Sequence, residues 1–403
     1  MNSTRTRILA ILIAIVIIGT GLWLYSYFHK DGAQVESGKK VQVMQADATM
    51  DEDQTEPTQL DSGYVPYNIK PVANGLFVPW SVAFPSEGRI LVTERSGQVR
   101  QIQDGQLQEE PVHVFDEVST RSEEGLMGMA LDPQYRSNHF VYFCYAYEDG
   151  GILQDKVVRM IDQGDSLLFE STVIDNIPAA QYHAGCRIKF GPDDKLYVTT
   201  GDATSKNIAQ DVESLGGKIL RLNTDGSIPD DNPIAGSYVY SYGHRNPQGI
   251  DWTGDGVLVS TEHGPSTFDG PPGGDEVNVI FPGKNYGWPI VSHDENKQGM
   301  ESPRIQFTPA VAPGSALVYS GKVFPQWTGK LLFGGLRGEG IYVVSFDQEF
   351  QVVEYEKLDI DVGRVREVVE GPDGHIYFTT SNRDGRGTFR AGDDILYSIV
   401  PSL

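Results

Sequence analysis

The chain has 403 residues, 39% of them hydrophobic, and a formal net charge of −23 at pH 7. This length suffices for a large buried core in one or two domains. The acidic balance argues against nucleic acid as a partner, because binding it needs clustered positive charge. An anionic ligand would need a local cluster of arginines. The 45 glycines and 23 prolines suit many short strands joined by tight turns.

The N-terminus begins with a basic segment, residues 1–7, followed by an uncharged apolar run over residues 8–28. As a helix this run would span about 31 Å, which matches the hydrocarbon core of a bilayer. We expect an uncleaved transmembrane anchor, because the apolar core of a cleaved signal peptide is usually shorter. A signal peptide or a buried soluble helix are the alternatives. Because the apolar segment is single and N-terminal, we expect the rest of the chain on the extracytoplasmic side, in the periplasm or at the cell exterior.

Residues 29–63 are expected to form an acidic, disordered linker, whose middle reads MDEDQTEPTQLD and contains no aromatic side chain. The folded domain is then expected over residues 64–403. Its two cysteines, Cys144 and Cys186, stand 42 positions apart. In an exported protein they could form a disulfide, and the alternative is two small buried apolar side chains.

A strand–turn–strand pattern recurs through the folded domain, and its turns read Pro-Asp-Asp, Gly-Asp-Gly or Pro-Asp-Gly. Six copies at intervals of roughly 45–65 residues fit a radial repeat of four-stranded units. The sequence therefore predicts an all-β fold, a six-bladed β-propeller, with another barrel or a sandwich as the alternative. The copies cover residues 79–97, 125–147, 187–202, 247–264, 315–338 and 366–382.

The second strand of most copies ends in polar residues or glycine. In a propeller these ends would meet at one mouth of the central channel, so polar groups far apart in sequence would become neighbours. Basic residues and one histidine at or near such positions are unexpected in so acidic a chain. These candidates are His183, Arg245 with its neighbour Asn246, Arg337, Arg364 and Arg366.

Several segments together resemble the soluble PQQ-dependent aldose sugar dehydrogenases of the glucose/sorbosone dehydrogenase family. The family consists of six-bladed propellers, and the likeness covers essentially everything after the linker. Short pieces such as the Pro-Asp-Gly turns are weak signals, whereas the order of the segments is specific. The segments read HAGCRIKFGPDDKLYVTTGD (183–202), QDVESLGGKILRLNTDGSIPDDNP (210–233), YSYGHRNPQGIDW (240–252), EHGP (262–265) and GGDEVNVIFPGKNYGWP (273–289).

The resemblance implies oxidation of aldose sugars at C1 to lactones, with hydride transfer to pyrroloquinoline quinone (PQQ). His183 aligns with the general base, a task that suits the pKa range of imidazole. Arg245 and Asn246 align with the pair that lies against the quinone, where a guanidinium stabilises developing negative charge. Arg337, Arg364 and Arg366 align with the basic residues that hold the three carboxylates of PQQ.

The resemblance also implies two calcium sites. Gly264 and Pro265 align with the residues whose main-chain carbonyls bind the calcium ion under the cofactor, and a hard cation accepts such oxygens. Glu276 and the carbonyl of Tyr286 align with a second, structural calcium site. The resemblance implies an aldose substrate and an electron acceptor, which we expect to be a quinone or a small redox protein. The N-terminal apolar segment adds the membrane as an expected partner.

The chain departs from the family pattern near the expected site. Residues 266–272, STFDGPP, form an insertion beside the calcium loop that could alter substrate access. Glu123 stands where relatives often carry glutamine, and Tyr182 where some glucose-active relatives carry aspartate. These two changes argue against glucose as the preferred substrate. Two alternatives are a calcium-dependent sugar-lactone hydrolase and a non-catalytic binding propeller.

Overall fold

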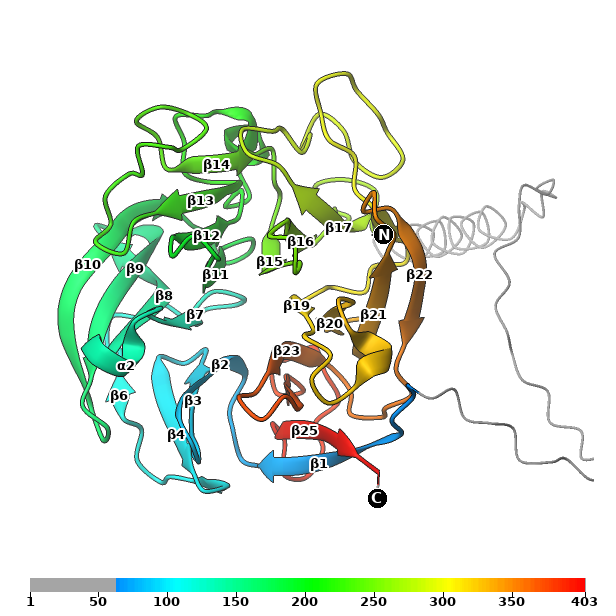
Figure 1. Cartoon of the computed structure of the whole chain (residues 1–403). Helices are drawn as coiled ribbons and strands as arrows, with labels where there is room; N and C mark the ends of the chain where they lie inside the picture. Colours follow the sequence, from blue (N-terminus) through cyan, green and yellow to red (C-terminus); the bar gives the residue numbers. More distant parts are fainter. Residues whose placement is uncertain (1–62, 403) are drawn as a thin grey trace, which may run out of the picture. The chain divides into compact units, whose positions relative to one another are not determined.

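The computed structural model describes residues 63–402, which form six β-sheets arranged around a central axis (Figure 1). The predicted six-bladed propeller is therefore confirmed. The expected anchor over residues 8–28 and the linker up to residue 62 lie outside the described residues. Within the described part, every helix is too short or too polar to cross a bilayer.

Each blade is an antiparallel sheet whose first strand lies nearest the axis. The first three blades run along the chain in sequence order. The first contains β2 (Pro79–Ser86), β3 (Arg89–Glu94), β4 (Gln98–Gln103), β5 (Gln106–Leu107) and β6 (His113–Val114). The second contains β7 (Leu126–Leu131), β8 (Phe140–Asp149), β9 (Ile152–Asp162) and β10 (Leu167–Pro178). The third contains β11 (Gly185–Phe190), β12 (Leu196–Thr200), β13 (Lys218–Leu222) and β14 (Val239–Tyr242).

The remaining blades complete the ring, and the last one draws on both ends of the folded domain. The fourth contains β15 (Pro247–Trp252), β16 (Leu258–Glu262), β17 (Asp275–Ile280) and β18 (Ile305–Phe307). The fifth contains β19 (Leu317–Val318), β20 (Leu331–Gly335), β21 (Gly340–Phe346) and β22 (Val352–Lys357). The sixth contains β23 (Val365–Glu370), β24 (Ile376–Thr380), β25 (Leu396–Pro401) and β1 (Tyr67–Ala73).

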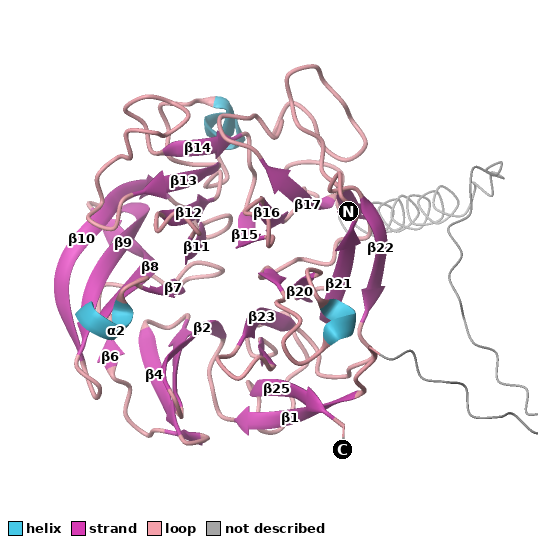
Figure 2. Cartoon of the chain, viewed as in Figure 1, coloured by secondary structure: helices cyan, strands magenta, loops and turns pink. Residues whose placement is uncertain are grey.

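Strand β1 closes the ring by pairing with β25, so the first and last strands share one blade (Figure 1). Their register places Tyr67 opposite Pro401 and Ile69 opposite Ile399. The innermost strands of neighbouring blades contact one another around the axis. The only helices in the described chain are α2 (Tyr135–Asn138) and the 3-10 turns Lys206–Gln210 and Pro325–Trp327 (Figure 2).

The six predicted repeats coincide with the two inner strands of the six blades, from β2–β3 to β23–β24. The inner strands are almost wholly buried, because each is covered by the adjacent blades and by the axis. Their turns lie at one end of the ring. The starts of the first strands and the ends of the second strands therefore meet at the other end.

The guanidinium of Arg187 crosses the axis and joins several blades. This residue lies in β11 and is buried. It donates from Nε to the carbonyl of Gln248 (2.9 Å) and from a terminal nitrogen to the carbonyl of Gly314 (2.8 Å). Its other terminal nitrogen reaches the carboxylate of Glu367 and the hydroxyl of Ser81. A charge so buried needs such partners, and here they tie β11 to residues of four other blades.

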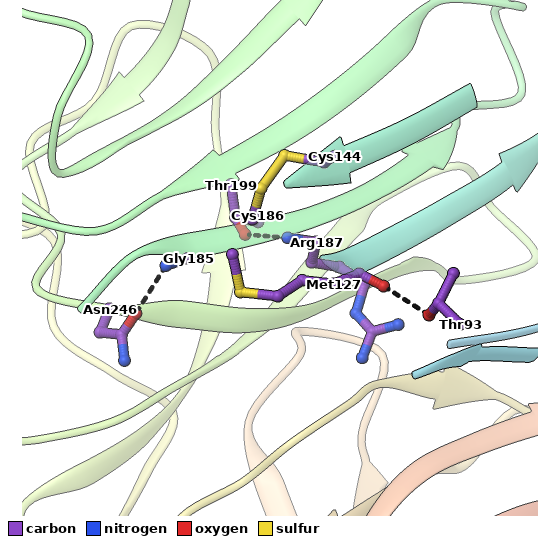
Figure 3. The surroundings of a disulfide bond; sticks show 8 residues. All are labelled: Thr93, Met127, Cys144, Gly185, Cys186, Arg187, Thr199 and Asn246. Atoms are coloured by element: carbon purple, nitrogen blue, oxygen red, sulfur yellow. Dashed lines mark hydrogen bonds between the residues drawn. A yellow bond between two sulfur atoms is a disulfide. The ribbon is translucent and has the colours of Figure 1, made fainter. Parts of the chain in front are cut away.

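Cys144 in β8 and Cys186 in β11 form a disulfide, which settles the pairing that the sequence left open (Figure 3). The bond joins the second blade to the third, and the tripeptide His183–Gly185 directly precedes Cys186. The backbone N–H of Gly185 also donates to Oδ1 of Asn246 (3.1 Å) from the fourth blade. The segment that carries His183 is therefore fixed to both neighbouring blades.

Replacing both cysteines by alanine is expected to lower the free energy of unfolding by about 4 kcal/mol, the loop-entropy value for a loop of this size. The sequence separation of 42 residues sets that size. Denaturant unfolding of the double variant, compared with the native protein with and without reductant, measures the loss. An unchanged unfolding midpoint would show that the bond adds nothing to stability.

Candidate active site

A cavity of about 960 Å³ opens at the end of the ring where the second strands finish. Of the ten predicted site residues, eight line it. They are His183, Arg245, Asn246, Gly264, Pro265, Arg337, Arg364 and Arg366. The expected convergence of the strand ends is therefore confirmed. Glu276 and Tyr286 lie apart from these and line a second, much smaller cavity.

The large cavity is strongly basic although the chain is acidic. Seven arginines line it against three carboxylates. Such a concentration of guanidinium groups suits a ligand with several carboxylates or phosphates. The arginines are Arg95, Arg121, Arg245, Arg337, Arg364, Arg366 and Arg386, and the carboxylates are Glu123, Asp275 and Asp384.

His183 is buried just before β11 and pairs with Asp202, whose Oδ1 lies 2.7 Å from its Nδ1. The other carboxylate oxygen of Asp202 accepts a hydrogen bond from the indole N–H of Trp288 at 2.7 Å. An imidazole that donates from Nδ1 to a carboxylate keeps the lone pair of Nε2 for a proton. The pair can therefore act as an oriented general base.

The backbone brings His183 and Asp202 together through Gly201. A side chain at position 201 would collide with the carbonyl oxygen of His183, so the close approach requires glycine. His183 itself has a positive φ of 58°, a conformation that costs free energy for residues other than glycine and concentrates at functional sites. The Gly201–Asp202 pair at the end of β12 thus determines how His183 is held.

Arg245 and Asn246 enter the cavity just before β15 and are held by Glu262 at the end of β16. The carboxylate of Glu262 accepts hydrogen bonds from the backbone N–H groups of both residues. Its second oxygen lies 2.9 Å from Nδ1 of His244. The side-chain Nδ2 of Asn246 is buried and has no hydrogen-bond partner in the described structure. A buried donor without a partner marks a place where a ligand oxygen could bind.

Arg364 and Arg366 flank the start of β23. Arg364 is paired with Asp384 at 2.6 Å, whereas Nε of Arg366 is buried and lacks a partner among residues 63–402. Burial lowers the pKa of Arg366 to about 9, and the positive charges of Arg95 and Arg364 act in the same direction. An anion bound in the cavity would stabilise the charged form of Arg366. Arg337 follows β20 and is exposed at the cavity.

Gly264 and Pro265 follow β16 along the wall of the cavity. The N–H of Gly264 donates to Asp275 at 2.8 Å, and the carbonyl of Pro265 accepts from Gly273 at 3.2 Å. A carbonyl oxygen has two lone pairs, so this bond leaves one for a cation. The described residues contain no cluster of three or more His, Cys, Asp or Glu suited to a metal ion. The carbonyl oxygens of this segment are therefore candidate ligands for a cation.

Glu276 in β17 lies beside Asn278, which donates to it at 2.9 Å. Burial raises the pKa of Glu276 to about 8, and the negative charge of Glu262 adds to this effect. The buried Oδ1 of Asn278 has no donor in the described region. Together these features leave buried oxygen atoms that a hard cation would satisfy. Tyr286 stacks its ring on His244, with 4.7 Å between the ring centroids.

Residues 266–272, the expected insertion, fold over His183 and Arg245. The ring of Phe268 stacks on the imidazole of His183 with 5.6 Å between centroids and 24° between planes. The carboxylate of Asp269 accepts from Nε of Arg245 at 2.8 Å. Ser266, Thr267, Phe268 and Pro272 line the cavity.

Sequence reasoning missed several residues of this site. Arg95 and Asp202 stand just beyond the ends of second strands, so the repeat register was the signal that could have found them. Asp384 lies in the loop after β24. Arg386 lies further along the loop after β24, and its pairing with Glu123 at 2.6 Å crosses from one blade to another. No local pattern indicates that contact.

The comparisons with known proteins agree with this geometry. The family model described as glucose / sorbosone dehydrogenase matches residues 76–395. The aldose sugar dehydrogenase YliI of Escherichia coli (strain K12) is 31% identical over 353 residues, which cover 79% of this chain and 91% of that protein. The quinoprotein glucose dehydrogenase B of Acinetobacter calcoaceticus is 24% identical over 417 residues, covering 79% and 86%.

Among solved structures, the PQQ-bound form of the aldose sugar dehydrogenase from Streptomyces coelicolor superposes with a TM-score of 0.74 at 33% identity. The match covers 84% of this chain and 99% of that one. The fold and the basic site thus define a propeller oxidoreductase. The chain belongs to the glucose/sorbosone dehydrogenase family, which sets aside the interpretation as a non-catalytic binding propeller.

Proposed function

We propose that the protein oxidises aldose sugars at C1 to lactones with PQQ and calcium. The observation that carries the proposal is the oriented His183–Asp202 pair at the edge of a cavity lined by seven arginines. A lactone hydrolase would be expected to bind its metal through side-chain carboxylates and Asn, and the described residues contain no carboxylate cluster suited to that task.

The cavity fits a planar cofactor with three carboxylates. The partnerless Nε of Arg366 and Nδ2 of Asn246 are buried donors that such a ligand would satisfy. Arg245 and Asn246 would lie against the quinone, and Arg337, Arg364 and Arg366 would bind the carboxylates. When bound, PQQ supplies the two-electron acceptor for the hydrogen removed from C1. Gly264 and Pro265 would offer carbonyl oxygens to one calcium ion, and Glu276 with the carbonyl of Tyr286 would bind a second.

His183 performs the proton step in this proposal. Its Nε2 accepts the proton of the anomeric hydroxyl while the C1–O1 bond becomes the carbonyl of the lactone. Asp202 keeps the proton of the neutral imidazole on Nδ1 and stabilises the positive charge that forms. Trp288 fixes the carboxylate of Asp202 through the bond at 2.7 Å. Burial of the pair excludes water, which strengthens these interactions.

The remaining expectations concern location and the electron acceptor. Residues 8–28 would anchor the enzyme in a membrane with the propeller on the extracytoplasmic side. Anchoring would keep the enzyme close to a membrane quinone or a small redox protein that reoxidises the cofactor. A disulfide between Cys144 and Cys186 supports an oxidising compartment.

Titrating the apoprotein with PQQ and Ca²⁺ tests the proposal. We expect saturable binding of PQQ. When an aldose from a panel is added, the cofactor should be reduced, which a change in its absorbance reports. Arg366→Met should weaken PQQ binding by about 10²-fold, since it removes a charge-assisted contact. Arg390→Met is the control, because Arg390 pairs with Asp361 in an exposed ion pair and does not line the cavity. A loaded enzyme that is reduced by none of the aldoses would contradict the proposal.

A further inference from the structure

The segment 266–272, hereafter the insertion loop, lies between the calcium-loop residues Gly264–Pro265 and β17. The loop is a compact turn. The backbone N–H groups of Asp269 and Gly270 both donate to the carbonyl of Ser266 at 2.9 Å. The N–H of Gly273 returns to the carbonyl of Pro265. The loop therefore has a defined shape at the cavity wall.

Asp269 fixes this loop to the cavity. One carboxylate oxygen accepts from the N–H of Ser266 at 2.7 Å, and the other accepts from Nε of Arg245 at 2.8 Å. Its side chain and that of Arg245 are nearly inaccessible to solvent. A buried charged pair with additional hydrogen bonds holds its geometry better than an exposed pair. Asp269 is therefore the anchor of the loop.

The turn places the side chain of Phe268 against His183. Its ring is 64% exposed, although one part stacks on His183. The lone pair of Nε2 lies in the plane of the imidazole, so a hydroxyl that reaches it approaches beside the two stacked rings and not between them. A sugar in that position would lie next to the exposed part of Phe268.

We propose that the insertion loop forms one wall of the sugar site, in which Phe268 selects the substrate by contact with the sugar ring and Asp269 holds the wall on Arg245. This inference rests on the proposed function. Aromatic side chains contribute much of the apolar lining of small-molecule sites, and the C–H groups of a pyranose present an apolar surface to them. A wall along the sugar ring also limits the room for a second sugar attached to that ring, so single hexoses are favoured over disaccharides.

The test compares Phe268→Ala and Phe268→Trp with the native holoenzyme on glucose, galactose, maltose and lactose. For Phe268→Ala we expect KM for the hexoses to rise about tenfold, the factor for losing a contact with roughly 50 Å² of apolar surface. The kcat should stay within about threefold. The ratio of kcat/KM for disaccharide over hexose should increase at least fivefold, and Phe268→Trp should shift it the other way. PQQ affinity should be unchanged in both variants.

Phe389→Ala is the matched control, because that ring is 60% exposed but does not line the cavity. The inference is overturned if the disaccharide-to-hexose ratio stays within twofold of the native value in Phe268→Ala, or if Phe389→Ala moves it equally. Because Phe268 is so exposed, its truncation removes little buried surface and does not threaten folding.

A second measurement tests the anchor without relying on turnover. In Asp269→Ala, deuterium exchange of the peptide covering residues 264–274 should be faster, since the N–H of Ser266 loses its acceptor. Asp361→Ala removes an exposed ion pair with Arg390 and should leave this peptide unchanged. Unchanged exchange in Asp269→Ala would overturn the anchoring role. If the native holoenzyme oxidised no aldose, the proposed function would fail, and the exchange result would still report on the loop.

Discussion

Replacing His183 by alanine is expected to lower kcat by about 10³-fold, within the range found when a positioned general base is removed. The imidazole donates from Nδ1 to Asp202, so its Nε2 is the group that can take the proton of the anomeric hydroxyl. The cofactor contacts proposed here come from other residues, so PQQ affinity should change by less than a few-fold. Stopped-flow measurement of how fast an aldose reduces the PQQ-loaded enzyme gives the rate of the chemical step. Equilibrium titration gives the PQQ affinity.

His375→Ala supplies the control for this experiment. His375 forms a similar pair, with Nδ1 2.7 Å from Asp373, but on a turn between β23 and β24 outside the cavity. Its removal should leave kcat unchanged. Added imidazole should restore part of the rate in His183→Ala, because the truncated side chain leaves room for it. Retention of more than a tenth of the native kcat would assign the proton step to another group.

The architecture could be predicted because its signal is local and repeated. Each inner hairpin carries its own turn residues, such as Pro192-Asp193 between β11 and β12, and these determine strand reversal without help from distant residues. The outer strands lack this signal. Strand β1 is placed by its register with β25 at the far end of the chain, and such pairing is invisible in a local pattern.

The site was predictable to the extent that its residues share a position in the repeat. Arg245, Arg364 and His183 all stand just before the first strand of a blade, so the propeller itself brings them together. Asp202 stands at the corresponding end of a second strand, and only the geometry shows that it faces His183. Whether Cys144 and Cys186 pair depends on adjacent blades meeting at β8 and β11.

The insertion loop marks the limit of inference from the residues alone. The sequence of residues 266–272 shows that extra chain follows Gly264 and Pro265, but not which way it folds. Asp269 could pair with any of the arginines of this face, and the structure selects Arg245. The placement of Phe268 on His183 follows from that one pair and from the turn closed on Ser266.

The second large effect is expected for Asp202→Asn, which should lower kcat by about 10²-fold while leaving the fold intact. Asparagine is nearly isosteric with aspartate but carries no charge to stabilise the imidazolium. Its amide can also donate to Nδ1 of His183, which would move the imidazole proton to Nε2 and remove the base. The carboxylate of Asp202 also accepts bonds from Trp288 and from the N–H of Thr204, and one oxygen of asparagine can keep only part of this set.

The tautomer of His183 distinguishes this positioning role from simple damage to the fold. In the native protein the neutral imidazole should carry its proton on Nδ1, and in Asp202→Asn on Nε2, which the nitrogen NMR chemical shifts of the ring report. Asp373→Asn, which alters the surface pair of His375, is the matched control and should leave the signals of His183 unchanged. A variant with reduced kcat, an unchanged tautomer and a lower unfolding midpoint would assign Asp202 to structure. A changed tautomer at an unchanged midpoint would assign it to the proton step, since only the hydrogen-bond partner of Nδ1 has then been altered.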